Sequence, residues 1–281
     1  MNLSPIDKVS GLNKDRFKTD YLDPLKPVVF TDLIDDWPAK TLWTIDYFKE
    51  HYGNLIVPIV DSSFSKGGKS YMSATATMKF KDYLNLIQTK ETPLRIFLWN
   101  IFKYAPLLAK DIRKFNIMNG FYNELPFMFF GGQGSYTKIH YDIDCSHVFL
   151  TQFQTRKRIL LFDQQQSKYL HHVPFTVGCL VDMIDPDESK YPSLKYIHGY
   201  ETILEHGQTL FIPSMYWHHI EYIEGGFSIS FRASNTFGLK LKGAVQLAKH
   251  FAIDRSINYA LGNKWMDIKL KMAKRNAHLD T

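Results

Sequence analysis

The chain has 281 residues, 45% of them hydrophobic and 15% aromatic, so it is long and apolar enough to bury a sizeable core. Two cysteines, Cys145 and Cys179, exclude a disulfide framework, and no run of about 18 apolar residues is present to cross a bilayer. The N-terminus has no apolar segment of the kind that export signals carry. We therefore expect a globular cytoplasmic protein with no membrane contact.

The net charge of +6 lies in the C-terminal tail. Residues 238–281 carry nine Lys/Arg and three Asp, which leaves 25 charges of each sign in residues 1–237. A basic tail either binds nucleic acid or an acidic surface, or is simply the solvated face of helices. Composition alone leaves both interpretations open.

The first 92 residues mix short strands and helices. "KPVVF" (26–30) and "NLIVPIVD" (54–61) are typical of strands, because β-branched residues predominate. The patterns of 44–52 and 78–88 predict helices, the first capped by Thr44 and ended by Gly53. This N-terminal region is predicted to be α/β.

The sequence pattern changes at about residue 93. Short strand-like runs separated by Gly, Pro, Asn or Asp follow one another to residue 237, and this pattern predicts a sandwich or barrel. They include "LRIFLWN", "PFMFF", "YTKIHYDI", "HVFLTQF", "KRILLF", "QTLFIP", "HHIEYI" and "FSISFRA". Residues 238–281 return to helical periodicity. No repeat or flexible linker divides the chain, so we predict one mainly β domain with flanking helices: 1–92, a core of 93–237, and 238–281.

"SYTKIHYDID" (135–144) holds the first candidate ligands. On a strand, residues two apart point to the same face, so His140 and Asp142 can look into a barrel together. They would then be two of the three ligands of a site with two histidines and one carboxylate. The short pattern also arises by chance, and a polar pair on an ordinary strand is the alternative.

The third ligand must come from a distant histidine. His218 opens the strand "HHIEYI" after a turn that contains proline, and this strand could lie across the barrel from residues 139–143. His219 would point to the opposite side of the same strand. His218 is therefore the best candidate.

Longer motifs surround these residues: "GSYTKIHYDID", then "RKRILLF", then "GYETILEHGQTLFIPSMYWHHIE" and "GGFSISF". Together they resemble the JmjC or cupin-8 branch of the Fe(II)/2-oxoglutarate oxygenases, most of all the group that contains the asparaginyl hydroxylase of hypoxia-inducible factor. The resemblance is strongest over residues 93–235. It implies a double-stranded β-helix, or jelly roll, with His140, Asp142 and His218 as iron ligands.

The resemblance also implies a site for the co-substrate 2-oxoglutarate. Lys157 matches the lysine that pairs with its distal carboxylate, and Thr137 matches a threonine that donates a hydrogen bond to the same group. Three positions depart from the family. Phe97 stands where a tyrosine is frequent, Arg232 replaces an asparagine on the last core strand, and His147 matches a second asparagine. Arg232 is thus a rival to Lys157 for the carboxylate.

The activity implied is hydroxylation of a side chain in a protein or peptide, with Fe(II), 2-oxoglutarate and O2. Family members also suggest a homodimer through C-terminal helices. One alternative is a tRNA-nucleoside hydroxylase, which the basic tail would suit. Another is a cupin-like metal-binding module without catalysis. Acidic residues in 163–175 and 181–192, five against two lysines, favour a polypeptide over nucleic acid.

Overall fold

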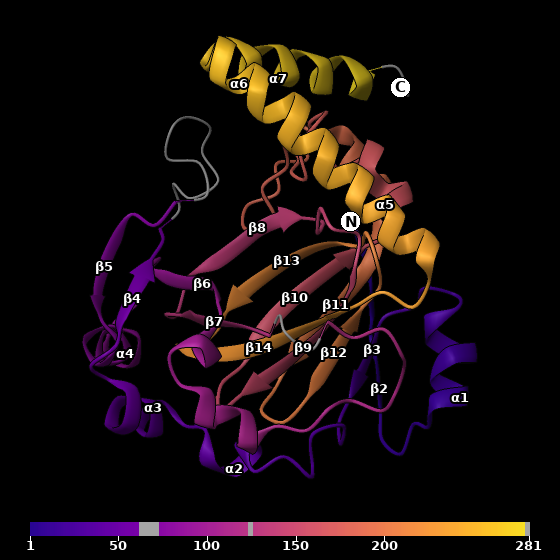
Figure 1. The fold of residues 1–281 in the computed structure, drawn as a ribbon. Helices are drawn as coiled ribbons and strands as arrows, with labels where there is room; N and C mark the ends of the chain where they lie inside the picture. The colour runs from indigo at the N-terminus through magenta and orange to yellow at the C-terminus, as the bar shows by residue number, and fades with distance from the viewer. Residues whose placement is uncertain (62–72, 123–125, 279–281) are drawn as a thin grey trace.

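The structure is a computed structural model that describes residues 1–61, 73–122 and 126–278. Two β-sheets face one another at its centre, and a helical segment stands at one end (Figure 1). This arrangement confirms the predicted jelly roll with flanking helices. Most neighbouring strands are antiparallel, whereas β1 with β11 and β2 with β3 are parallel.

The order of the strands across each sheet differs from their order along the chain. The five-stranded sheet contains β1 (Asn2–Pro5), β11 (His198–Leu204), β10 (Lys157–Phe162), β13 (Trp217–Tyr222) and β8 (Tyr136–His140). The seven-stranded sheet contains β2 (Asp7–Val9), β3 (Val28–Phe30), β12 (Thr209–Ile212), β9 (His147–Phe153), β14 (Gly226–Ala233), β7 (Phe127–Gly131) and β6 (Arg95–Trp99). A separate hairpin pairs β4 (Ile56–Ile59) with β5 (Ala76–Lys79).

Strand β10 is buried on both faces. Because successive side chains point to opposite sides, Ile159 and Leu161 pack between the sheets, while Leu160 and Phe162 pack on the outer face. Lys157, two residues before Ile159, therefore starts on the inner face. The layer between the sheets is aliphatic and includes Val29, Val148, Leu150, Leu210 and Ile212 from the seven-stranded sheet.

The N-terminal region covers the outer face of the seven-stranded sheet. Its α-helices are α1 (Lys14–Phe17), α2 (Ala39–Leu42), α3 (Ile45–Tyr52) and α4 (Phe80–Thr89). They pack through aromatic rings, for example Phe48 against Phe227 with ring centres 5.2 Å apart. Helix α3 confirms the predicted cap, because the Thr44 hydroxyl accepts a hydrogen bond from the Tyr47 backbone N–H at 2.9 Å.

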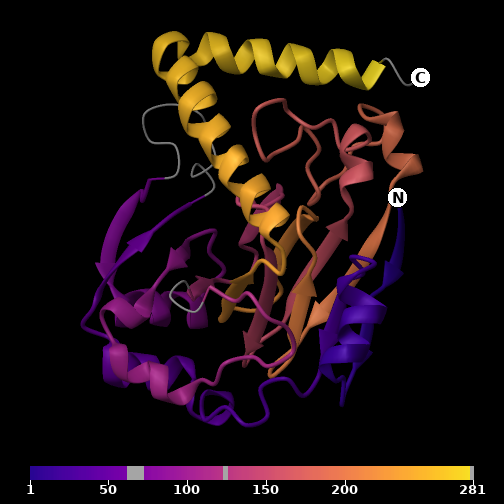
Figure 2. The same cartoon turned by 45° about the vertical axis from the view of Figure 1, so that its right-hand side comes forward.

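The C-terminal helices rise from the end of the jelly roll at which β8 stops (Figures 1 and 2). They are α5 (Phe237–Lys249), α6 (Arg255–Leu261) and α7 (Asn263–His278), with a π-helical turn at His250–Asp254. Their apolar stripes are open to solvent: Leu241 is 55% exposed and Val245 44%. No helix in the described ranges is long and apolar enough to span a bilayer.

Four strands were not expected from the sequence. Residues 78 and 79, predicted to begin the helix 78–88, instead end β5, where pairing with β4 holds them extended, and helix α4 begins at Phe80. Strand β11 carries charged and polar residues but is held by β10 on one side and β1 on the other. Strands β1 and β2 are short and largely exposed, so tertiary pairing rather than local pattern forms them. Strand β8 ends at His140, and Asp142 lies in the turn beyond it instead of on the expected strand.

Gly131 on β7 permits the packing of Tyr222. A methyl group at Gly131 would lie 2.6 Å from Ser135 Oγ and 2.7 Å from the Tyr222 ring, both of which are buried. We expect Gly131→Ala to lower the free energy of unfolding by about 1–3 kcal/mol through overpacking, measured by urea denaturation. Gly238→Ala is the control, because no heavy atom lies within 4 Å of its added methyl. Equal stability of the two variants would contradict this packing.

Candidate active site

Two histidines and one aspartate converge where β8 and β13 meet. The strands pair antiparallel with His140 directly opposite His218, and their ring centres lie 4.2 Å apart. Asp142 joins them from the turn after β8. One ligand atom from each of the three residues lies within 4.8 Å of the others. Two nitrogens and one oxygen at this separation can surround a single cation.

Hydrogen bonds hold both imidazoles in the same tautomer. The Nδ1 atom of His140 lies 2.8 Å from the Lys138 carbonyl, and that of His218 lies 3.0 Å from the Tyr216 carbonyl. A carbonyl only accepts, so each Nδ1 carries the proton and each Nε2 keeps a free lone pair. Burial and the neighbouring His218 lower the pKa of His140 to about 3, and burial also lowers the pKa of His218. Both rings are therefore neutral at pH 7, as metal ligands must be.

Arg232 on β14 bridges two carboxylates beside the histidines. Its guanidinium donates to Asp142 Oδ1 and to Asp144 Oδ1, each at 2.8 Å. Burial would raise the pKa of Asp142, but Arg232, His218 and His140 outweigh it and hold that pKa below its usual value. Asp142 is thus ionised, with one oxygen engaged by Arg232 and the other available.

A β-bulge brings Thr137 to the same face as His140. His218 and Ile220 are two residues apart on β13, whereas their partners His140 and Thr137 are three apart on β8. On a regular strand, side chains three residues apart point to opposite faces, but the extra residue of the bulge on β8 turns them to the same face. Thr137 and His140 therefore both face the interior, at neighbouring levels.

Lys157 lies deeper on the same face. It is opposite Tyr222, while Leu161, four residues further along β10, is opposite His218. Four residues of strand span about 13 Å, so Lys157 begins about that far from the histidines. Its side chain is 1% exposed and crosses to the other sheet, where Nζ donates to Ser228 Oγ at 2.5 Å.

Lys157 has no counter-ion among the described residues. Its ammonium lies 4.1 Å from the centre of the Tyr222 ring, and no carboxylate of the described chain forms a salt bridge with it. Burial lowers the pKa of Lys157 well below its usual value. A buried cation without an anion is costly, so this position favours the arrival of a negatively charged group.

His147 lies apart from the other predicted site residues. Val148 packs between the sheets, so His147 points to the opposite face, where its ring lies 5.4 Å from Phe211. Both ring nitrogens are engaged: the Ser214 backbone N–H donates to Nδ1 at 3.0 Å, and Nε2 lies 3.2 Å from Asn235 Oδ1. The ring has no free nitrogen in this arrangement.

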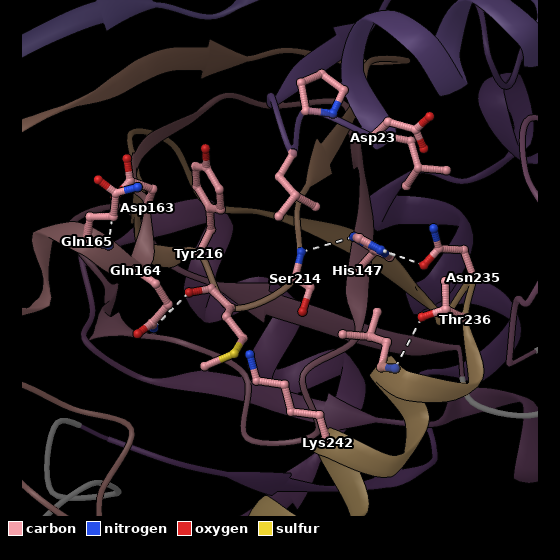
Figure 3. A pocket seen from close by; sticks show the side chains of 15 residues that line it. Asp23, His147, Asp163, Gln164, Gln165, Ser214, Tyr216, Asn235, Thr236 and Lys242 are labelled. Atoms are coloured by element: carbon pink, nitrogen blue, oxygen red, sulfur yellow. Dashed lines mark hydrogen bonds between the residues drawn. The ribbon is translucent and has the colours of Figure 1, made fainter.

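A cavity of about 550 Å³ opens beside His147 rather than at the histidine pair (Figure 3). Figure 3 shows His147 between Ser214 and Asn235, with Lys242 of α5 below them. None of the three candidate metal ligands lines this cavity. The ligand chemistry, not the size of this cavity, therefore marks the candidate active site.

Several residues of the site were not identified from the sequence. Asp144, Ser228 and Tyr222 contact Arg232 or Lys157, and no short motif distinguishes them. Arg95 offered a signal, because it is the single charged residue in the apolar run "LRIFLWN". It is 7% exposed, and its Nη1 donates to Thr137 Oγ1 at 2.7 Å.

A family model described as a cupin-like domain, cupin-8, matches residues 14–233. The chain belongs to this cupin-like, JmjC-type family. The match covers most of both sheets and all three converging residues. The family assignment therefore applies to the part of the chain that builds the candidate site.

Curated relatives support the same family. The chain is 28% identical over 243 residues to lysine-specific demethylase JMJ30 of Arabidopsis thaliana, a match that covers 82% of this chain and 55% of the relative. It is 30% identical over 230 residues to lysine-specific demethylase 8 of Danio rerio, covering 77% and 55%. The tRNA wybutosine-synthesizing protein 5 of Gallus gallus is 26% identical over 246 residues, covering 80% and 76%. The chain thus spans about half the length of the demethylases it matches.

Arg232 positions the Asp142 carboxylate by donating to it from one guanidinium nitrogen while the other donates to Asp144, an arrangement that lysine cannot reproduce. We expect Arg232→Lys to lower the Mn(II) affinity of the protein about tenfold, as changes behind metal ligands do, measured by electron paramagnetic resonance. Arg158→Lys is the matched control. Arg158 also bridges two carboxylates, Glu201 and Glu221, but its side chain is 35% exposed. An equal loss in both variants would contradict a specific role for Arg232.

Proposed function

We propose that this protein is an Fe(II)- and 2-oxoglutarate-dependent oxygenase that hydroxylates an amino-acid side chain in a protein or peptide. JmjC-type proteins generally use these two cofactors. The observation that carries the proposal is the convergence of His140, Asp142 and His218. The same inner face leads on to Lys157, a buried lysine that forms no salt bridge with the described residues.

The donor set fits Fe(II). Two neutral imidazole nitrogens and one carboxylate oxygen leave three of six positions open, whereas a structural zinc site uses four protein ligands. When bound, iron with 2-oxoglutarate and O2 supplies the oxidation: the substrate C–H becomes C–OH, and the co-substrate becomes succinate and CO2. The protein holds the ligands and excludes water.

Lys157 is proposed to bind the distal carboxylate of 2-oxoglutarate, with the Thr137 hydroxyl as a second donor. Arg232 is the weaker candidate for this role, because its guanidinium already forms salt bridges with Asp142 and Asp144. These carboxylates hold the pKa of Arg232 above its usual value in spite of burial. The charge of Arg232 is thus already balanced, while that of Lys157 is not.

A polypeptide substrate is supported by the segment that borders the site. Val177 and Gly178 lie against the end of β8: Gly178 pairs with His140, and the Tyr141 backbone N–H donates to the Val177 carbonyl at 3.2 Å. The segments 163–175 and 181–192 carry five acids and two lysines. Asp182 follows the contacting residues closely, whereas Glu188 pairs with the Met1 amine beside β1, at the other edge of this sheet. The acids of the two segments still suit a peptide better than a phosphate backbone. The Arabidopsis and Danio relatives are demethylases specific for lysine, a protein side chain.

Turnover without a substrate tests the oxygenase itself. The purified protein should bind one Mn(II) or Fe(II) and, with Fe(II), release succinate from 2-oxoglutarate only when O2 is present. Asp142→Ala should abolish both metal binding and succinate release, because it removes a ligand. Metal binding without any succinate would instead support the alternative of a non-catalytic cupin-like module.

A tRNA nucleoside is the second candidate substrate. The match with the Gallus gallus protein covers 76% of that relative, a larger share than for the two demethylases. Basic helix α5 also packs near the site, since a methyl group at Gly243 would lie 2.1 Å from the Asp144 carbonyl oxygen. We expect peptides, not tRNA, to stimulate succinate release. Stoichiometric hydroxylation of a tRNA nucleoside with binding that weakens steeply in salt would reverse this choice.

Lys157→Ala should weaken 2-oxoglutarate binding by about 10- to 100-fold, measured by calorimetry on the Mn(II) protein. Burial depresses the pKa of Lys157 in the empty pocket, and a bound carboxylate would raise it again. Between these two pKa values binding should therefore take up a proton, and affinity should fall as pH rises. The uptake should vanish in Lys157→Ala. If Arg232→Ala loses the affinity and Lys157→Ala keeps it, the two assignments are exchanged.

We also propose a cytoplasmic homodimer formed through the C-terminal helices. Cys145 and Cys179 are both free thiols, as a reducing compartment allows. The apolar side chains of Leu241, Val245 and Ile268 are 55%, 44% and 43% exposed. Exposed apolar stripes of this kind favour association with another protein surface. A truncation after Thr236 should convert the protein from dimer to monomer or make it aggregate, measured by light scattering after gel filtration. A monomeric intact chain would contradict the dimer.

A further inference from the structure

A second buried cation, Arg95, reaches the same interior region as Lys157. Arg95 begins β6 in the seven-stranded sheet, and its guanidinium donates to Thr137 on β8 of the other sheet at 2.7 Å. It therefore crosses the space between the sheets, as Lys157 does toward Ser228. Under the proposed function Thr137 donates to the co-substrate carboxylate, so Arg95 touches that pocket directly.

The charge of Arg95 is not balanced by its surroundings. Burial lowers its pKa, and the groups that oppose this effect are Tyr222, Tyr83, Tyr136 and, with the least influence, Asp61. Burial raises the pKa values of all three tyrosines, so they are neutral at pH 7 and cannot act as counter-ions. The salt bridges of the described chain do not include Arg95.

Arg232 provides an internal comparison. It is also a buried arginine, but two carboxylates at 2.8 Å hold its pKa above the usual value. Arg95 instead has a hydroxyl as its side-chain acceptor. A buried guanidinium with donors to spare and no carboxylate in contact is costly unless an anion binds there. Arg232 is thus paired with carboxylates of the protein, whereas Arg95 is available to bind an anionic ligand.

Tyr222 places the two available cations near each other. The ammonium of Lys157 lies 4.1 Å from the centre of the Tyr222 ring. Arg95 is the register partner of Gly131 on β7, and a methyl group at Gly131 would lie 2.7 Å from the same ring. Lys157 and Arg95 thus approach the same buried ring from opposite sheets, one from β10 and the other from β6.

The hydrogen bond from Arg95 also orients the Thr137 hydroxyl. A hydroxyl has one proton to donate and two lone pairs to accept with. Since Thr137 Oγ1 accepts from Arg95, its own proton remains free to donate to another group. Phe97, two residues after Arg95 on β6, has no hydroxyl, and the Arg95 guanidinium carbon lies 5.8 Å from its ring centre.

We propose that Arg95 and Lys157 together bind the distal carboxylate of a 2-oxo dicarboxylic acid, with Arg95 supplying the contact that Phe97 lacks. This inference rests on the proposed function. It predicts that the pocket binds 2-oxo dicarboxylates more tightly than 2-oxo monocarboxylates, and that this difference in affinity is larger than Lys157 alone would produce. Two cations from different sheets also fix the direction of the bound carboxylate, because the guanidinium donates in a defined plane.

The test compares two ligands on the Mn(II)-loaded protein by calorimetry, without turnover. The ligands are 2-oxoglutarate and 2-oxobutyrate, which has the same 2-oxo acid group but no distal carboxylate. Arg95→Gln should weaken 2-oxoglutarate binding by about 10- to 100-fold and change 2-oxobutyrate binding by less than about twofold. Arg158→Gln on the outer face of β10 is the matched control, and it should change neither affinity.

Each outcome separates the two proposals. If the unaltered protein does not bind 2-oxoglutarate, the proposed function fails. If it binds and Arg95→Gln binds equally well, or loses both ligands equally, the role of Arg95 is wrong while the proposed function stands. If Arg95→Gln does not fold, Arg95→Lys takes its place: it should reduce the preference for 2-oxoglutarate severalfold, and an unchanged preference would overturn the inference.

Discussion

The pairing of β8 with β13 fixes the position of almost every group in the candidate site. It sets His140 opposite His218, and its bulge turns Thr137 to the same face. On the other side of β13, the register with β10 aligns Leu161 with His218 and places Lys157 four residues deeper. A slip of one residue in either pairing would turn these side chains to the opposite face. The aliphatic layer between the sheets opposes a slip of β10, because the slip would turn Arg158 away from Glu201 and Glu221 and into that layer.

Charge divides the interior into two unlike ends. Near the histidines, the two carboxylates of Asp142 and Asp144 outnumber the single charge of Arg232, so this end is net negative and suits a cation. Near Tyr222, Lys157 and Arg95 contact hydroxyls, and burial lowers both of their pKa values. Such an arrangement destabilises the empty protein to some degree. That cost is understandable if an anion occupies the inner end, and a linear dicarboxylate could then extend from it toward the histidines.

The sequence predicted the architecture well because strand alternation and turn residues are local signals. The strands containing 147–153 and 157–162 were predicted to the residue. Strand β11 was missed, because partners distant in sequence stabilise its polar run. The convergence of His140, Asp142 and His218 was expected, yet the turn position of Asp142 was not. Arg95 could not be placed, because its contact with Thr137 joins strands of different sheets, a relation that no local pattern records.

The C-terminal segment is tied to the site as well as to solvent. Gly243 of α5 approaches the Asp144 carbonyl so closely that no side chain would fit, and Asp144 in turn binds Arg232, which holds Asp142. Further along the segment, Trp265 of α7 packs near Phe175, with ring centres 5.6 Å apart, in the segment that borders the site. The helices thus contact both the turn that carries Asp142 and Asp144 and the segment that contains Phe175. A partner that binds their exposed stripes would therefore also limit the movement of the groups around the entrance to the site.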